Sequence, residues 1–194
     1  MLIFNNMTKN EKQFLIESNL IEGVGEEGLE DSIKAYNYLM SIKSAITEKH
    51  ILETHRLLIK TLNPRIAGKF RKVNVGIYKG NICIRKCPKP KEIKELLSDV
   101  ILNINKSIKF GCGLEDKEGY VKGCHINFEE AHPFEDGNGR TGRLVYNWHR
   151  KELGLPLKII YNKNKQNYYK WFKSEEKISE QLAEEFIKYH YKDL

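Results

Sequence analysis

The chain has 194 residues, enough for one full-sized domain because single hydrophobic cores usually serve about 100–200 residues. Hydrophobic residues make up 40% and charged residues 30%, and 14 glycines accompany only 5 prolines, which excludes a disordered tail and a collagen-like chain. No apolar run reaches the roughly 18–20 residues of a bilayer span, and the first residues lack a signal-peptide pattern. We therefore expect a soluble, cytoplasmic protein that has no membrane partner.

The net charge of +7, from 33 Lys and Arg against 26 Asp and Glu, favours an anionic partner such as a nucleotide, a nucleic acid or an anionic lipid. It does not choose among them, because much of the excess is scattered lysine that is typical of a solvated surface. The four cysteines contain no C-x2-C pair, which predicts reduced, structural thiols.

The N-terminal part of the sequence has a helical period. Residues 8–22 place Phe14, Leu15, Leu20 and Ile21 on one stripe, and glycines follow at once, so we expect a helix that ends there. Two more helices are predicted over 29–45 and 47–62, where Asn63-Pro64 ends the second.

Residues 70–86 follow a different period. Apolar residues alternate on both sides of Lys79-Gly80-Asn81, which predicts a short β-hairpin. Because a single hairpin is not stable alone, it must lie on the helices.

The remaining sequence returns to helices. They are predicted over 91–109, 120–131 and 140–153, with a glycine-rich connector at 111–119 and an amphipathic C-terminal helix over 174–194. The sequence shows no repeat and no linker, so the expected fold is a mainly α helical bundle with one short β-hairpin, in a single domain spanning 1–194.

One loop carries most of the chemistry. His132 follows a predicted helix and precedes Pro133, which disfavours helical backbone and should hold the histidine at an exposed turn. A histidine with a pKa near neutrality can take a proton from an attacking hydroxyl. His132 is therefore the candidate catalytic base.

Residues that suit a phosphate follow directly. The loop Gly137-Asn138-Gly139 runs into the next helix, whose first amides and positive dipole end form an anion hole. Arg140 and Arg143 lie on one face of that first turn, where a bound anion would compensate their charge. Asp136 can bind Mg²⁺ bridged to phosphate oxygens.

These residues together favour transfer of a phosphoryl or nucleotidyl group from a nucleoside triphosphate to a hydroxyl. The alternative is an ordinary connection in which Asp136 and Asn138 make turn hydrogen bonds and both arginines meet surface acids. A lone Gly-Asn-Gly would fit that alternative; twelve residues that supply a base, a metal ligand, an anion hole and two arginines in order do not.

The segment 132–143 resembles the Fic-family signature HPFx[DE]GNGRxxR at every specified position, and the wider resemblance covers roughly 15–175. It implies an all-helical core and transfer of AMP from ATP to a Tyr, Thr or Ser hydroxyl of a target protein, with Mg²⁺ and release of pyrophosphate. By this resemblance His132 is the base, Asp136 the magnesium ligand, and the nucleotide-binding residues are Gly137, Asn138, Gly139, Arg140, Thr141, Gly142 and Arg143. The two arginines would hold the β- and γ-phosphates.

Two further segments resemble parts of that family. Gly68-Lys69-Phe70-Arg71 and the hairpin over 70–86 resemble its flap, which would dock a target strand along Val75, Gly76, Ile77 and Tyr78; a hairpin that only caps the core is the alternative. Ser18 to Gly23 resembles its inhibitory motif [ST]xxxE[GN], so that Ser18 and Glu22 belong to an inhibitory helix within 1–25. A Glu22–Arg143 pair would keep Arg143 from the γ-phosphate, whereas a solvated glutamate at a helix end is the alternative.

We therefore expect a self-inhibited protein adenylyltransferase with a protein target. One rival interpretation is removal of AMP by water that Glu22 orients. Another is a catalytically silent module that binds nucleotides or nucleic acid through the positive charge, although the complete signature makes nucleic acid the less favoured partner. Self-modification and assembly into a homo-oligomer are both left open.

Overall fold

A computed structural model describes residues 7–79, 82–110 and 116–172. In these residues the α-helices are α1 (Lys9–Ile21), α2 (Leu29–Ser41), α3 (Glu48–Ile59), α4 (Ile93–Phe110), α5 (Lys117–Ala131), α6 (Asn138–Glu152) and α7 (Lys165–Tyr169). The strands are β1 (Gly76–Lys79) and β2 (Ile82–Lys86), and single 3-10 turns occupy Glu26–Gly28, Pro90–Glu92, Asn162–Asn164 and Lys170–Phe172. The predicted mainly α fold with one hairpin is confirmed, while the C-terminal helix predicted over 174–194 lies outside the described residues.

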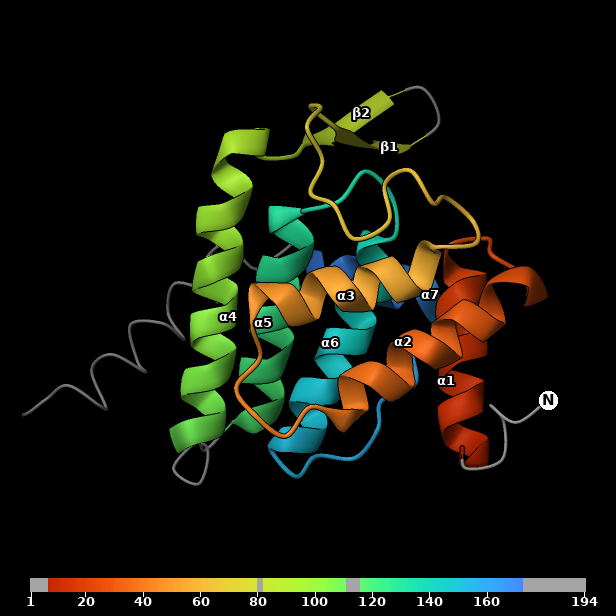
Figure 1. Ribbon diagram of the computed structural model, residues 1–194, viewed down its shortest axis with the longest axis vertical. Coiled ribbons are helices and arrows are strands. Elements are labelled where there is room, and N and C mark those ends of the chain that lie inside the picture. Colours follow the sequence, from red (N-terminus) through yellow and green to blue (C-terminus); the bar gives the residue numbers. More distant parts are fainter. Residues whose placement is uncertain (1–6, 80–81, 111–115, 173–194) are drawn as a thin grey trace, which may run out of the picture.

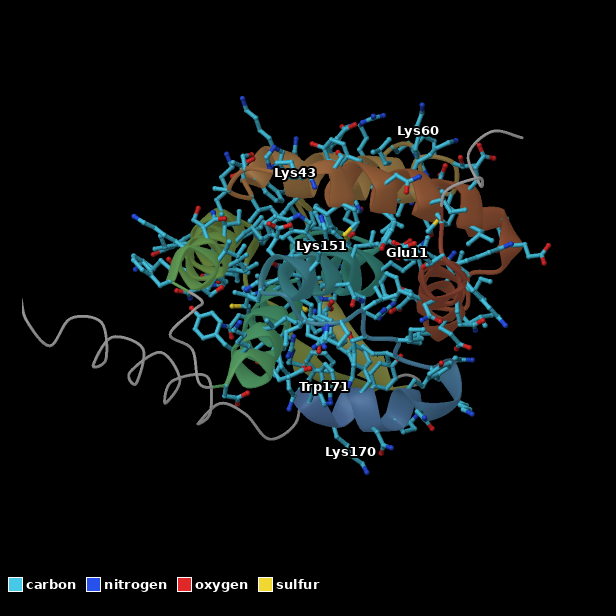
Figure 2. The ribbon with its side chains drawn as sticks, turned by 90° about the horizontal axis from the view of Figure 1, so that it is seen from below. Glu11, Lys43, Lys60, Lys151, Lys170 and Trp171 are labelled. Carbon is cyan, nitrogen blue, oxygen red and sulfur yellow. The ribbon has the colours of Figure 1, made fainter. Side chains whose placement is uncertain are left out.

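Helix α6 lies at the centre of the bundle (Figure 1), in contact with each of α1 to α5. Figure 2 shows Lys43 and Lys60, which follow α2 and α3, on one side, and Lys170 and Trp171 on the opposite side. Lys151, near the end of α6, lies between them. No helix in the described part of the chain is long and apolar enough to cross a membrane.

Almost every side chain of α6 is buried, including several polar ones. Most of those find partners inside the protein. Asn147 exchanges hydrogen bonds with the Lys158 backbone, the His149 ring bonds the Ser107 hydroxyl, and Arg150 binds the Glu118 carboxylate. The central helix is therefore held by specific polar contacts as well as by apolar packing, as buried polar groups require.

Helix α1 begins at a capping box, in which the Thr8 hydroxyl and the Glu11 carboxylate each bond the other residue's backbone N–H. Its buried face carries Phe14 and Leu15 as predicted. Leu20, predicted on the same stripe, is instead 41% exposed, because buried Ser18 and Asn19 face the bundle there. A polar buried face gives no hydrophobic period, so this part of the stripe was assigned wrongly.

The hairpin is shorter than the predicted range of 70–86. β1 and β2 pair antiparallel with a register irregularity between Ile77 and Tyr78, and 70–75 carries no strand. Val73, expected in the strand, lies outside it and is 52% exposed. Arg85 of β2 donates a hydrogen bond to the Glu129 carbonyl near the end of α5, so the hairpin is attached to the helices at the predicted catalytic loop.

Candidate active site

The loop between α5 and α6 lies beneath the hairpin, beside the connection from α3 to β1 (Figure 1). Its first residue, His132, has φ 44° and ψ 60°, and it is the single non-glycine residue with positive φ in the described ranges 7–79, 82–110 and 116–172. Left-handed backbone costs an L-residue roughly 1–2 kcal/mol. The conformation therefore depends on the surrounding contacts, and His132 is half-buried rather than exposed as predicted.

Two side chains brace the middle of this loop. The Asn138 amide accepts from the Phe134 N–H at 2.9 Å and donates to the Phe134 carbonyl at 2.8 Å. The His55 ring stacks on the Phe134 ring at 3.7 Å, accepts from the Gly68 N–H and bonds the Asp136 carbonyl. The side chain of Asn138, a residue predicted in the phosphate cradle, is thus engaged in shaping the loop, which leaves its backbone N–H as the group that could face a phosphate.

The His132 imidazole is arranged as a proton acceptor. Its Nδ1 lies 3.3 Å from the Glu129 carbonyl, and because a carbonyl only accepts, Nδ1 carries the proton and Nε2 is left unprotonated. Burial is the main cause of a pKa below the usual histidine value, and the positive charges of Arg71 and Arg85 add to it. The ring is therefore neutral near pH 7 and able to accept a proton.

The residues predicted to form an anion cradle lie at the start of α6. Gly137 has φ +79°, a backbone that glycine adopts without strain, and it turns the chain into the helix. The Arg140 and Arg143 side chains are 2% and 1% exposed. Burial lowers the pKa of Arg140. The negative charge of Asp136 raises it and so offsets part of that effect. Nε and Nη1 of Arg140 and Nη1 of Arg143 are buried and have no hydrogen-bond partner within 7–79, 82–110 and 116–172, although buried donors are normally satisfied.

Asp136 fits the role of a magnesium ligand. Its side chain is 60% exposed, with Oδ2 3.5 Å from Nη2 of Arg140, and its Oδ1 accepts from the Gly137 N–H at 2.6 Å. In the described residues no three His, Cys, Asp or Glu side chains are grouped to hold a metal. Mg²⁺ at Asp136 would therefore take its other ligands from substrate phosphates and water, as it commonly does.

Ser18 of α1 and Glu22, the residue directly after that helix, contact the same arginine. Nη2 of Arg143 lies 2.9 Å from Oε1 of Glu22 and 2.9 Å from the Ser18 carbonyl oxygen, while Nε donates to the Ser18 hydroxyl at 3.0 Å. A Cβ atom added to Gly139 would collide with the Glu22 carboxylate. The carboxylate therefore lies against the cradle itself.

Thr141 and Gly142, predicted as nucleotide-binding, lie deeper. Thr141 is fully buried, and its N–H donates to the Gly137 carbonyl. A Cβ on Gly142 would collide with the Glu129 carboxylate and lie 3.0 Å from Cδ1 of Phe128. The small size of Gly142 therefore serves the close packing of α5 against α6.

Two neighbours of the arginines were missed by the sequence analysis. Tyr168 presents its ring to Arg143 at 5.6 Å and hydrogen-bonds the His125 ring. Glu129 is half-buried with its carboxylate against Gly142 of α6, and desolvation of that carboxylate raises its pKa to about 7. Glu129 lies one helical turn before His132, so the face that the predicted helix turns toward the loop could have indicated it. No local sequence pattern indicated Tyr168.

The predicted docking residues lie along the hairpin and the segment leading into it. Val75, Gly76 and Ile77 are half-buried. The backbone of Tyr78 pairs with that of Cys83 in the register of the two strands.

Known proteins match both the sequence and the fold. The Fic/DOC family model matches residues 45–149. A protein of Culex quinquefasciatus named protein adenylyltransferase Fic is 32% identical over 143 residues, covering 73% of this chain and 27% of the relative. One of the same name from Drosophila grimshawi is 29% identical over 178 residues, covering 87% of this chain and 35% of the relative. The chain thus spans about a quarter to a third of these relatives.

Solved structures share the fold. A Fic domain containing signaling protein from Bacteroides thetaiotaomicron superposes with a TM-score of 0.73 at 20% identity, covering 84% of this chain and 70% of that one. Fic-1 from C. elegans gives a TM-score of 0.66 at 22% identity, covering 84% and 55%. With the family model matching more than half of the residues and the motif lying inside that range, the chain belongs to the Fic/DOC family.

Proposed function

We propose that the protein is a self-inhibited adenylyltransferase that transfers AMP from ATP to a Tyr, Thr or Ser hydroxyl of a target protein. One observation carries this proposal: two almost fully buried arginines at the N-terminus of α6 hold three donor nitrogens that have no hydrogen-bond partner among the described residues. A polyphosphate anion would satisfy those donors. The relatives named protein adenylyltransferase support AMP as the transferred group.

The reaction follows from the arrangement. The target hydroxyl attacks the α-phosphorus of ATP as Nε2 of His132 accepts its proton, and the bond to the β-phosphate oxygen breaks to release pyrophosphate. The α6 amides with Arg140 and Arg143 hold the phosphates, so catalysis rests on positioning and charge stabilisation. Mg²⁺ bound at Asp136 would neutralise phosphate charge.

Self-inhibition rests on the position of Glu22. Its carboxylate lies against Gly139 and on Arg143, where a γ-phosphate would otherwise bind. ATP held without that contact would have its α-phosphate misplaced, and small misplacements strongly reduce the rate. In this arrangement 1–25 is the inhibitory segment, 120–154 the catalytic helix-loop-helix and 70–86 the flap of a single domain.

The hairpin is the proposed docking site for the target backbone through Val75, Gly76, Ile77 and Tyr78, by strand addition. The attachment of the hairpin to α5 through Arg85 supports this proposal, because a strand added to the hairpin would then lie beside the loop that carries His132. Binding of a target peptide should shift the backbone amide NMR signals of these four residues and leave those of α4 unchanged.

The test compares wild type, Glu22→Gly and Glu22→Gly/His132→Ala after incubation with α-labelled ATP, Mg²⁺ and a cell lysate. Glu22→Gly should label proteins more strongly than wild type, and the double variant should not. Equal labelling by Glu22→Gly and wild type would contradict self-inhibition. Label that survives loss of His132 would contradict its role as base, and a silent binding module predicts no label in any sample.

Removal of AMP is the second candidate, favoured by the position of the Glu22 carboxylate against Gly139 at the start of α6. A carboxylate at this loop could orient water toward an AMP-modified hydroxyl. Wild type incubated with a target that Glu22→Gly has labelled should then release AMP, whereas Glu22→Gly should not.

A further inference from the structure

Arg71 is a buried arginine in the segment between α3 and β1, with a side chain that binds only backbone in the contacts described. Residue 71 is 2% exposed. Its Nε donates to the His132 carbonyl at 2.7 Å, its Nη1 to the Val73 carbonyl at 3.0 Å and its Nη2 to the Pro88 carbonyl at 2.6 Å. Each guanidinium nitrogen thus binds a different stretch of chain.

The three carbonyls belong to the end of α5, the segment entering β1 and the segment leaving β2. A guanidinium presents its donors in a rigid planar fork, so the three stretches are fixed relative to one another. The Arg71 N–H also donates to the Pro133 carbonyl at 3.0 Å. One residue therefore binds the carbonyl oxygens on both sides of the peptide nitrogen of Pro133.

That position is where the backbone needs support. His132 adopts left-handed backbone, which few residues other than glycine adopt, and the proline that follows it disfavours the right-handed helical alternative. Rotation about φ of His132, the backbone angle that is positive, would move its carbonyl away from Nε of Arg71. The same rotation would change the direction of the imidazole and its distance from the Glu129 carbonyl.

We propose that Arg71 is a positioning residue for His132: it holds the left-handed backbone that aims the imidazole, and it ties that backbone to both ends of the hairpin. The catalytic consequence rests on the proposed function, but the coupling of Arg71 to His132 does not. A target strand that docks on the hairpin would therefore influence the orientation of His132 through Arg71. His132 is the proposed base for the hydroxyl of that same target.

The first test reads the imidazole directly. Nitrogen-15 histidine spectra are compared for wild type, Arg71→Met, Arg71→Lys and Arg65→Met, the last an exposed arginine on the same connection, with His132→Gln to assign the signal. Arg71→Met and Arg71→Lys should shift His132 from the Nδ1–H form toward a mixture of tautomers, whereas Arg65→Met should match wild type. Arg71→Met should also raise the pKa of His132, because a nearby positive charge is lost, while Arg71→Lys should not.

The second test measures AMP transfer in the Glu22→Gly background. Arg71→Met and Arg71→Lys should lower kcat at least tenfold with the KM for ATP within threefold, since Arg71 does not contact the anion cradle, and Arg65→Met should change neither. If Arg71→Met does not fold, Arg71→Lys decides, because lysine keeps the charge but cannot bind three carbonyls as a fork.

A folded Arg71 variant with wild-type His132 signals, or with unchanged kcat, overturns the proposal. If Glu22→Gly itself transfers no AMP, the proposed function fails, and the imidazole spectra still decide whether Arg71 positions His132.

Discussion

Replacing Glu22 with glutamine should make the protein bind a nucleoside triphosphate more tightly. Glutamine keeps the size of the side chain and removes the charge that competes with a phosphate for Arg143. The pair joins an arginine that is 1% exposed to a carboxylate that is 35% exposed, at 2.9 Å. Exposed pairs contribute about 0.2–1 kcal/mol, and breaking fully buried ones costs about 3–5 kcal/mol.

This geometry lies between the two limits, so about 1–3 kcal/mol of interaction would be freed for the phosphate. Since about 1.4 kcal/mol corresponds to a tenfold change in Kd, the affinity for a triphosphate should rise roughly 5- to 140-fold. Isothermal titration with a non-hydrolysable ATP analogue and Mg²⁺ measures the change. AMP is the matched control ligand, because it lacks the phosphates that Arg143 would hold.

AMP should bind wild type and Glu22→Gln within about threefold of each other, as expected for a contact worth well under 1 kcal/mol. Unchanged triphosphate affinity in Glu22→Gln would refute the competition between Glu22 and phosphate. An equal gain for AMP would show that the carboxylate acts on the whole site rather than on Arg143.

Three other outcomes are expected. In the Glu22→Gly background, His132→Asn should lower kcat by roughly 10²–10⁴ with ATP affinity unchanged in titration; a parallel loss of affinity would mean that His132 binds nucleotide instead. Burial lowers the pKa of His55 in the folded protein to about 4, whereas an unfolded histidine has a pKa near 6.5. Below that value the unfolded chain binds more protons than the folded one. The free energy of unfolding should therefore fall as the pH drops from 7 to 5. Urea unfolding checks this, and His55→Gln should reduce the slope; an unaltered slope would assign it to other groups. Gly137→Ala should lower stability more than Gly154→Ala does, by about 1–2 kcal/mol. Both glycines have positive φ, but of the two only Gly137 has neighbours that an added Cβ would meet, at 3.0 Å from Ile59 and 3.3 Å from His55. Equal losses of stability in thermal unfolding would mean that backbone strain accounts for the whole effect.

The local features of this protein were readable from its sequence. Hydrophobic period predicted the helices and the hairpin, because each element must bury an apolar face. Glycines and Pro133 marked where the catalytic loop turns. The order from His132 to Arg143 indicated phosphate chemistry because the chain itself places those groups within one turn and one helix start.

Contacts between distant residues depended on the tertiary structure. The sequence placed Glu22 only at the end of a helix, and the resemblance supplied the pairing with Arg143; the packing of α1 against α6 shows the carboxylate against Gly139. Arg71 stood in a recognisable segment, but its three carbonyl partners are backbone atoms, which every residue carries and no pattern distinguishes. The sequence by itself determined which side chains the loop carries. Only the tertiary structure decided how deeply the arginines are buried, which of their donor nitrogens lack partners among the described residues and that His132 has left-handed backbone. These properties depend on the residues that pack around the loop.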